Sequence, residues 1–427
     1  MAPRTQHILL IAGVVVLVLV LIALGILPGR KAPGPSSTVI EFWGFGDDDE
    51  VWTSVINAFK KQYAYIGVVY KRFDEATYED TLINRIAAGK GPDIFMLKNS
   101  QLAKHRDKIA PISQRVFKFT ARDMNTLFVD GATMALTEKD GTIVGVPLFV
   151  DTPALFYNKD IFNAEGIASP PGASWEDVTA LAGRLTQKTV FNELIRSGMA
   201  LGTFDNIDNA FEIVSSLFLQ TGGKVIDRKS SAVDFPPSFV EALDLYTSFA
   251  DPSKTQFSWT KDFPGALDAF AEGKTAMAIG FASDIGRLKG KNAHLNFGIV
   301  PLPQQKKFSV ATVYGSYFFP TVSKFSKHAD AAWTFILYAA SRDVAREYLD
   351  VTNRPPARRD LITAGSKSPE LDVFYRQALI AKDWAVPDDR GARRAFRDVI
   401  TAVAAGTEKS SQAHARLRSQ IELLMAR

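Results

Sequence analysis

The sequence predicts an α/β protein whose body begins with a parallel, doubly wound sheet. Short apolar patterns typical of strands occur at 39–43, 68–73 and 93–97. Two patterns with helical spacing lie between them, at 47–59 and 78–89. Strands that alternate with helices over so short a stretch indicate βαβ units, and such units build parallel sheets.

The first helix is supported by its apolar spacing and by its charged beginning. Val51, Val55 and Phe59 recur at every fourth position and therefore share one helical face. Residues 47–50 are all acidic, and acidic side chains interact favourably with the positive end of a helix dipole. Both signals place the beginning of the helix within this acidic run.

The rest of the body continues the mixture of strands and helices. Further strands are predicted at 144–149, 154–158, 275–281 and 297–301. Further helices are predicted after Ser174 and at 209–220, 239–249, 264–271, 328–340, 393–404 and 413–425. The run at 209–220 stops at Gly222-Gly223, a good signal for the end of a helix.

Composition excludes several classes of protein. The 427 residues are 46% hydrophobic and 22% charged, which excludes wholesale disorder and allows two or three domain-sized units. The chain has no cysteine, so disulfides, thiolate zinc sites and cysteine nucleophiles are excluded. Five scattered histidines and a net charge of +4 give no reason to expect a metal site or a nucleic-acid partner. We expect no cofactor.

The N-terminus carries a membrane signal. Residues 8–27 form an uninterrupted run of apolar residues and glycine, which as a helix would span roughly 30 Å, the thickness of the hydrocarbon core of a bilayer. The run is long for a cleaved signal peptide, although Ala23 and Gly25 could form an exit site. We expect a short cytoplasmic N-terminus (1–7), an uncleaved single-pass anchor (8–27) and a polar linker (28–38). The alternative is secretion after cleavage.

Six local motifs, in order, resemble one family. They are IEFWGFGD (40–47), AAGKGPDIF (87–95), GVPLFVDTPALFYNKDIF (145–162), SWED (174–177), FAEGKTAMAIG (270–280) and FGIVPLP (297–303). The body from residue 39 onward resembles family 1 extracellular solute-binding proteins, the maltose-binding-protein-like sugar receptors of bacterial ABC importers. The longest motif resembles the crossing from the first lobe to the second, and FGIVPLP resembles the return crossing.

The resemblance implies the two-lobed, type II fold of periplasmic binding proteins, preceded here by one transmembrane helix. Each lobe would be a mainly parallel sheet flanked by helices. The first lobe would hold residues 38–150 and 300–345, and the second residues 151–299 and 346–427. Lobes of this kind hinge around a ligand, and ligands of open α/β sheets bind beyond the carboxyl ends of the strands. The cleft between the lobes is therefore the expected site.

The implied function is capture of a mono- or oligosaccharide and its delivery to the permease of an ABC importer. The protein would be a monomer, held at the cell membrane by its N-terminal helix with the body on the extracytoplasmic side. Sugars present C–H faces, which suit aromatic rings, and hydroxyls, which need hydrogen-bond partners when buried. The candidate ligand-binding residues are Trp43, Phe45, Asp47, Asn99, Asp151, Asn206, Phe281, Tyr314, Tyr317 and Trp384.

Several candidates have a structural alternative. Trp43 could pack in the core and Asp47 could only cap a helix, since helix beginnings recruit aspartate. Asn99 follows a predicted strand and could belong to an ordinary turn. Asp151 could stabilise the hinge. Phe281 matches a position at which relatives stack an aromatic residue on sugar, by resemblance.

Arginines gather in two clusters, at 354–359 and at 390–397. They form a solvated face, or they bind an anionic ligand or a partner surface.

Other functions remain as alternatives: a sensory ectodomain, a receptor for an anionic or peptide-like solute, and a membrane-anchored glycoside hydrolase. A hydrolase needs two carboxylates about 5–9.5 Å apart across the scissile bond. The sequence has neither a Walker A motif nor a G-x-S-x-G elbow. We therefore expect a binding protein with no catalytic residues.

Overall fold

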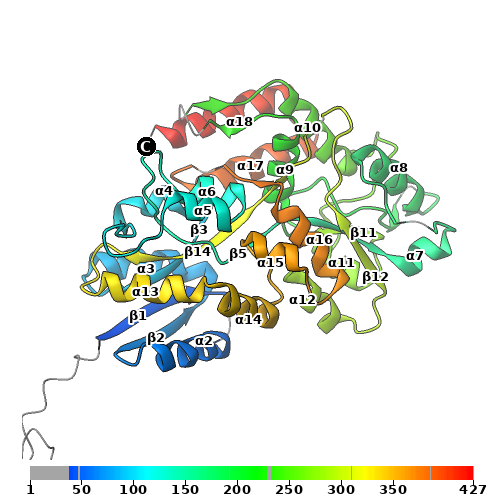
Figure 1. Ribbon diagram of the computed structural model, residues 1–427. Helices are drawn as coiled ribbons and strands as arrows, with labels where there is room; N and C mark the ends of the chain where they lie inside the picture. Colours follow the sequence, from blue (N-terminus) through cyan, green and yellow to red (C-terminus); the bar gives the residue numbers. More distant parts are fainter. Residues whose placement is uncertain are drawn as a thin grey trace, which may run out of the picture.

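The computed structural model describes residues 38–46, 49–168, 170–191, 193–227, 232–308, 310–384 and 386–426. Two α/β lobes lie side by side, with β1, β2, β3 and β14 in one and β11 and β12 in the other (Figure 1). The division into two lobes agrees with the fold that the sequence motifs imply.

The first lobe contains a six-stranded mixed sheet with the main order β2-β1-β3-β14-β4, and β5 also pairs with β14. Its strands are β1 (Thr38–Phe45), β2 (Ile66–Phe73), β3 (Ile94–Lys98), β4 (Ile109–Ala110), β5 (Phe149–Asp151) and β14 (Ser316–Ser323). The first three run parallel, as the alternation of strands and helices predicts. β14 returns from the second lobe and runs antiparallel to β3, β4 and β5.

The helices around this sheet are α2 (Asp49–Gln62), α3 (Glu75–Ala87), α4 (Leu102–His105), α5 (Ala121–Leu127), α6 (Asp130–Leu136), α13 (Ala329–Ala339), α14 (Arg342–Thr352) and α15 (Arg359–Ala364). The predicted stripe of α2 buries Val55 and Phe59, with Trp52 beside them. The Trp52 ring lies 4.7 Å from Phe42 of β1, so this stripe joins the helix to the sheet.

The sheet of the second lobe is antiparallel, which corrects the expectation of a mainly parallel sheet. It has the order β11-β6-β12, with β6 (Ala154–Asn158) antiparallel to both β11 (Met277–Gly280) and β12 (Phe297–Pro301). The chain enters the lobe through β6. The two outer strands, joined through α12 (Asp284–Lys291), share the opposite direction. Local apolar runs cannot reveal that a strand inserts between two later ones.

The other helices of the second lobe are α7 (Lys159–Ala164), α8 (Trp175–Leu185), α9 (Ala210–Gln220), α10 (Ser238–Thr247), α11 (Ala266–Ala271), α16 (Pro369–Ala378), α17 (Asp389–Ala404) and α18 (Ser410–Met425). Short strand pairs complete the fold: β7 (Gln187–Lys188) with β8 (Leu194–Arg196), β9 (Val225–Ile226) with β10 (Val233–Asp234), and β13 (Val313–Tyr314) with β15 (Ala381–Lys382).

The predicted strand at 144–149 forms only at its end, as β5. Upstream, the backbone bonds to two different partners: Val144 N–H donates to Leu136 O and Leu148 N–H donates to Phe318 O. A continuous ladder therefore does not form there.

One buried glutamine joins two crossings between the lobes. The Gln377 amide nitrogen donates to Pro153 O at 3.0 Å and to Thr152 Oγ1 at 3.1 Å, both in the crossing from β5 to β6. Its amide oxygen accepts from Leu302 N–H at 2.7 Å, in the return crossing after β12. Gln377 thereby fixes the spacing of the two connecting segments.

The sequence motifs imply that the first lobe ends at residue 345, which lies within α14. α14 packs on α2, and α15 packs on α5 and α14, all of them elements beside the first sheet. α16, by contrast, packs on β12 of the second lobe as well as on β5. We therefore propose that the first lobe extends through α15 and that the second resumes near α16.

Within the described part of the chain, no helix has both the length and the apolar character needed to cross a bilayer. The expected anchor at 8–27 and nearly all of the expected linker lie outside the described residues.

Replacing Gln377 by alanine should lower the free energy of unfolding by at least about 2 kcal/mol, because each buried polar group left unpaired costs roughly 1–3 kcal/mol. Urea unfolding of the soluble body measures this. Gln62→Ala, at the exposed end of α2, is the matched control and should change stability by less than about 0.5 kcal/mol. Equal effects of the two substitutions would contradict the role assigned to Gln377.

Candidate functional site

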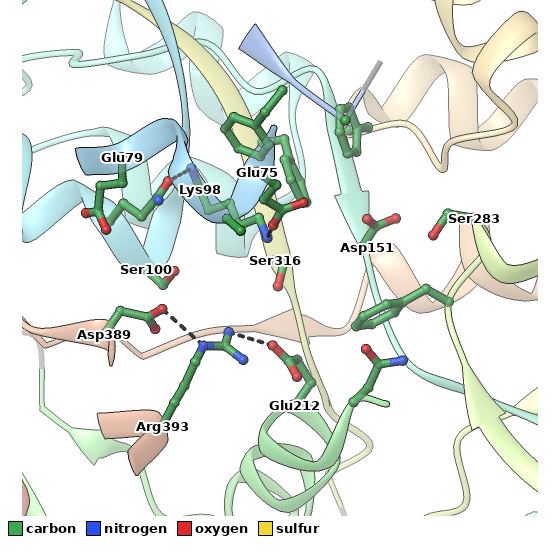
Figure 2. Close-up of a pocket in the computed structure, with 18 of the residues that line it drawn as sticks. Glu75, Glu79, Lys98, Ser100, Asp151, Glu212, Ser283, Ser316, Asp389 and Arg393 are labelled. Carbon is green, nitrogen blue, oxygen red and sulfur yellow. Dashed lines mark hydrogen bonds and ion pairs between the residues drawn. The ribbon is translucent and has the colours of Figure 1, made fainter. Parts of the chain in front are cut away.

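A cavity of about 530 Å³ lies between the lobes, and we call it the first cavity (Figure 2). The first lobe supplies its wall from the ends of β1 and β3 and from α3, and the second lobe from α9, α17 and the segment before α12. Its lining side chains include Phe45, Glu75, Glu79, Lys98, Ser100, Phe149, Asp151, Asp208, Asn209, Glu212, Phe281, Ser283, Ser316, Phe318, Arg354, Asp389, Arg390 and Arg393.

Arg393 forms the centre of the wall contributed by the second lobe. Its guanidinium reaches Glu212 at 2.7 Å and Asp389 at 3.1 Å, as the dashed lines in Figure 2 show. It also lies 4.4 Å from the centre of the Phe211 ring. Burial acts to raise the pKa of Glu212, but the charge and hydrogen bond of Arg393 outweigh it and hold that pKa below its usual value. Glu212 is therefore a charged hydrogen-bond acceptor.

Glu79 of α3 forms the corresponding centre on the first lobe. It accepts from His105 at 3.0 Å and pairs with Lys104 at 3.2 Å. The hydrogen bond from His105 is the main cause that lowers the pKa of Glu79 to about 2. Arg390 of α17 approaches Glu79 at 3.5 Å and Asp80 at 3.0 Å. These contacts are ion pairs that cross from one lobe to the other.

The cationic side chains of the first cavity are all paired. Lys98 pairs with Glu75, Arg354 with Asp151, Arg390 with Asp80 and Arg393 with Glu212. Among the described residues, six carboxylates line the cavity against these four cations: Glu75, Glu79, Asp151, Asp208, Glu212 and Asp389. The cavity therefore offers charged hydrogen-bonding groups without an excess of positive charge.

Three of the predicted site residues line the first cavity: Phe45, Asp151 and Phe281. Phe281 is partly exposed, whereas Phe45 is buried and the Lys98 amine lies over its ring. The structure brings these three together from the end of β1, the lobe crossing and the end of β11. Asp47 lies outside the described residues.

Three predicted aromatic residues belong to the core and do not line this cavity. Trp43 packs 4.5 Å from Phe73, and its indole nitrogen donates to Glu41. Tyr314 is buried, which raises its pKa well above the usual value. Trp384 stacks 5.6 Å from Phe396. All three rings pack inside the lobes. For Trp43 this is the core position that the sequence allows as the alternative to ligand binding.

Three other predicted residues use their polar atoms to hold the fold. Asn99 donates to Asp383 at 2.6 Å and accepts from Tyr317 N–H at 2.9 Å. The Tyr317 hydroxyl donates to Ala381 O at 2.9 Å. Asn206 donates to two backbone carbonyls and accepts from the Trp259 indole. None of the three lines the first cavity.

Of the described charged residues that line the cavity, only Asp151 is among the ligand-binding residues predicted from the sequence. Arg390, Arg393 and Arg354 belong to the two arginine clusters, but most other cluster members pair with acids outside the cavity, for example Arg359 with Asp130. Glu212 had a usable signal, because it is the one charged residue in the apolar run of α9. No sequence signal marks Glu79 as a site residue, because acidic residues are common on the exposed faces of helices.

Asp284 lies directly behind Phe281 at the beginning of α12. Its carboxylate accepts from Phe281 N–H at 2.7 Å and so fixes the end of β11. Burial raises the pKa of Asp284 to about 6, and the charges of Asp208 and Asp151 add to the increase. At neutral pH the Asp284 carboxylate is therefore mostly charged, although burial disfavours the charged form.

Comparison with known proteins gives concordant results. A sequence profile described as bacterial extracellular solute-binding protein matches residues 54–387. A putative binding protein of Brucella abortus is 24% identical over 257 residues, which is 59% of this chain and 58% of that protein. A putative ABC transporter periplasmic-binding protein of Escherichia coli is 23% identical, over 78% of this chain and 76% of its own length. The chain thus spans little more than half the length of the Brucella relative.

Among solved structures, the cyclic alpha-maltosyl-1,6-maltose binding protein of Arthrobacter globiformis superimposes with a TM-score of 0.77. The sequences are 18% identical, and the match covers 92% of this chain and 99% of that one. This likeness establishes the two-lobed fold.

Replacing Asp284 by asparagine should make stability less dependent on pH. Between about pH 4 and 6 the folded protein holds a proton that the unfolded chain has lost, so stability falls as pH rises through this window. One pKa unit corresponds to about 1.4 kcal/mol, and we expect Asp284→Asn to gain on the order of 1–3 kcal/mol at pH 7. Urea unfolding at pH 4, 5, 6 and 7 measures both the dependence of stability on pH and the gain at pH 7.

The matched control is Asp343→Asn, whose side chain is 91% exposed. It should leave the pH profile of the native protein unchanged. Equal slopes for Asp284→Asn and the native protein between pH 4 and 6 would contradict the interpretation.

Proposed function

The chain belongs to the family of bacterial extracellular solute-binding proteins, and from this premise we propose that it captures a saccharide between its lobes. The observation that carries the proposal is the composition of the first cavity. A partly exposed phenylalanine ring, Phe281, faces a set of charged hydrogen-bonding groups supplied by both lobes. Sugars require this combination, because their C–H faces pack on rings and their hydroxyls need partners.

The charges favour a neutral solute over an anionic one. Each cation of the first cavity already has a carboxylate partner, and carboxylates outnumber cations among the lining side chains. A phosphate or carboxylate ligand would need to displace one of these pairs. Hydroxyls, in contrast, can donate to the same carboxylates while the ion pairs persist.

The family consists of binding proteins, so no catalytic step is assigned to the cavity. We propose that the protein works as a monomer and delivers its ligand to the membrane subunits of an ABC importer. The resemblance of the Escherichia coli relative, described as an ABC transporter protein, supports this partner. The N-terminal segment 8–27 would tether the body outside the membrane, or would be removed as a signal peptide.

Ligand capture by two lobes requires that the ligand bind the closed arrangement more tightly than the open one. The ion pairs of Arg390 with Asp80 and Glu79 join α17 of the second lobe to α3 of the first. They assist closure, but only weakly, because the side chains of Arg390 and Asp80 are about half exposed.

The test of saccharide capture is a titration of residues 38–427 with mono- and oligosaccharides, followed by calorimetry and melting temperature. One saccharide class should bind saturably and raise the melting temperature. Phe281→Ala should weaken that binding at least about fivefold through loss of ring contact. Phe325→Ala, an exposed ring away from the cavity, is the control. A folded protein that binds no saccharide would contradict the proposal.

Asp80→Asn tests the cross-lobe ion pairs without touching the cavity wall, because Asp80 does not line it. We expect saccharide affinity to fall about two- to fivefold at low salt, and the difference from the native protein to shrink at high salt. Asp262→Asn, in an exposed loop of the second lobe, should have no such effect. A salt-independent loss would indicate a cause other than the ion pairs.

A further inference from the structure

A second cavity continues the first along the gap between the lobes. It has a volume of about 780 Å³ and is lined by parts of α2, α12 and α14. Its apolar side chains include Val51, Ile285, Tyr348, Val351 and Leu371, and its charged ones Glu50, Lys289 and Glu347. The mixture of apolar and polar groups is suitable for further sugar rings.

Of the residues that the structure describes, three line both cavities: Gly46, Ser283 and Arg354. They therefore mark the boundary between the two. Gly46 has no side chain and that of Ser283 is small, so Arg354 supplies the largest group at the boundary. A Cβ atom built on Gly46 would lie 3.7 Å from the Arg354 guanidinium, so the guanidinium lies beside the end of β1 at this boundary.

The Arg354 side chain is held in place from several directions. It pairs with Asp151 at 3.0 Å, and the side chains of the two residues are 15% and 6% exposed. The guanidinium carbon lies 4.7 Å from the Phe149 ring centre and 5.9 Å from that of Phe318. To swing aside, it would have to leave both a largely buried ion pair and its ring contacts.

The backbone around Arg354 is fixed as well. Asn353 ends α14 in the left-handed conformation, with φ at 53°. After Arg354, Pro355 accepts a hydrogen bond from Val150 N–H at 2.9 Å, and Pro356 forms a bridge with Phe149. The segment is therefore attached to β5, the strand that leads into the second lobe.

We propose that Arg354 is the partition that limits the length of saccharide held in the cleft. This inference rests on the proposed function and names its specificity-determining residue. With Arg354 in place, a bound saccharide fills the first cavity and its next ring meets the paired guanidinium. Removal of the side chain would connect the two cavities and allow a longer chain to extend into the second.

The test compares the native protein with Arg354→Ala by calorimetry, using malto-oligosaccharides of two to seven units and manno-oligosaccharides of two to four units. For the native protein, affinity should rise with length and then level off once the first cavity is filled. For Arg354→Ala, affinity should continue to rise, so that the longest oligosaccharide gains at least about tenfold over the shortest that binds.

Three further variants keep the test decisive. Arg342→Ala, at the other end of the α14 segment and with a side chain 56% exposed outside the cleft, should retain the native length profile. Because Arg354→Ala leaves Asp151 without this partner, the pair Asp151→Asn and Asp151→Asn/Arg354→Ala repeats the comparison with both charges removed. The gain for long chains should appear again in the double variant.

The outcomes separate the two proposals. If the native protein binds an oligosaccharide series and Arg354→Ala has the same length profile, the partition is wrong and saccharide capture stands. A uniform loss of affinity at all lengths also overturns the partition and makes Arg354 a direct ligand contact. If the native protein binds no saccharide, the proposed function fails and this inference fails with it.

Discussion

The structure depends on how the chain is held where it crosses between the lobes. Gln377 joins the segment after β5 to the segment after β12, and Asn99 joins the end of β3 to the segments at Tyr317 and Asp383. Both side chains are almost fully buried, so their hydrogen bonds do not compete with water. Each amide contacts segments that are distant in sequence, and together they set where the two lobes face each other.

The way the lobes face each other determines which charged groups meet in the cleft. Its charged groups come from both lobes, and most of them pair with an opposite charge beside them. Arg393 is paired within the second lobe, whereas Arg390 reaches across to the first. A cleft of paired charges can bind many hydroxyls without imposing a net charge on its ligand. It can also respond to closure, because some of the pairs exist only when the lobes approach each other.

Residues with similar sequence signals occupy different positions in the structure, some in the core and some at the cavity. Trp43 and Phe45 lie two positions apart on β1 and therefore on the same face of the strand, but only Phe45 is its last residue. Trp43 packs beside Phe73, and Phe45 reaches the cavity. Sequence alone did not decide between them, because both are aromatic and both lie at a strand end. The same applies to Asn206, which accepts a hydrogen bond from Trp259, whereas Asn209, three positions further along the chain, lines the cavity.

The sequence by itself determined the elements and the family. Apolar spacing located α2, β3 and α9 to within a few residues, because amphipathic periodicity is a local property. Ordered motifs identified a two-lobed binding protein. Only the tertiary structure decided that the second sheet is antiparallel, that Glu212 and Arg393 meet in the cavity, and that Arg354 lies between two cavities. These features depend on contacts between residues far apart in the chain, and local patterns do not encode which distant partner each side chain finds.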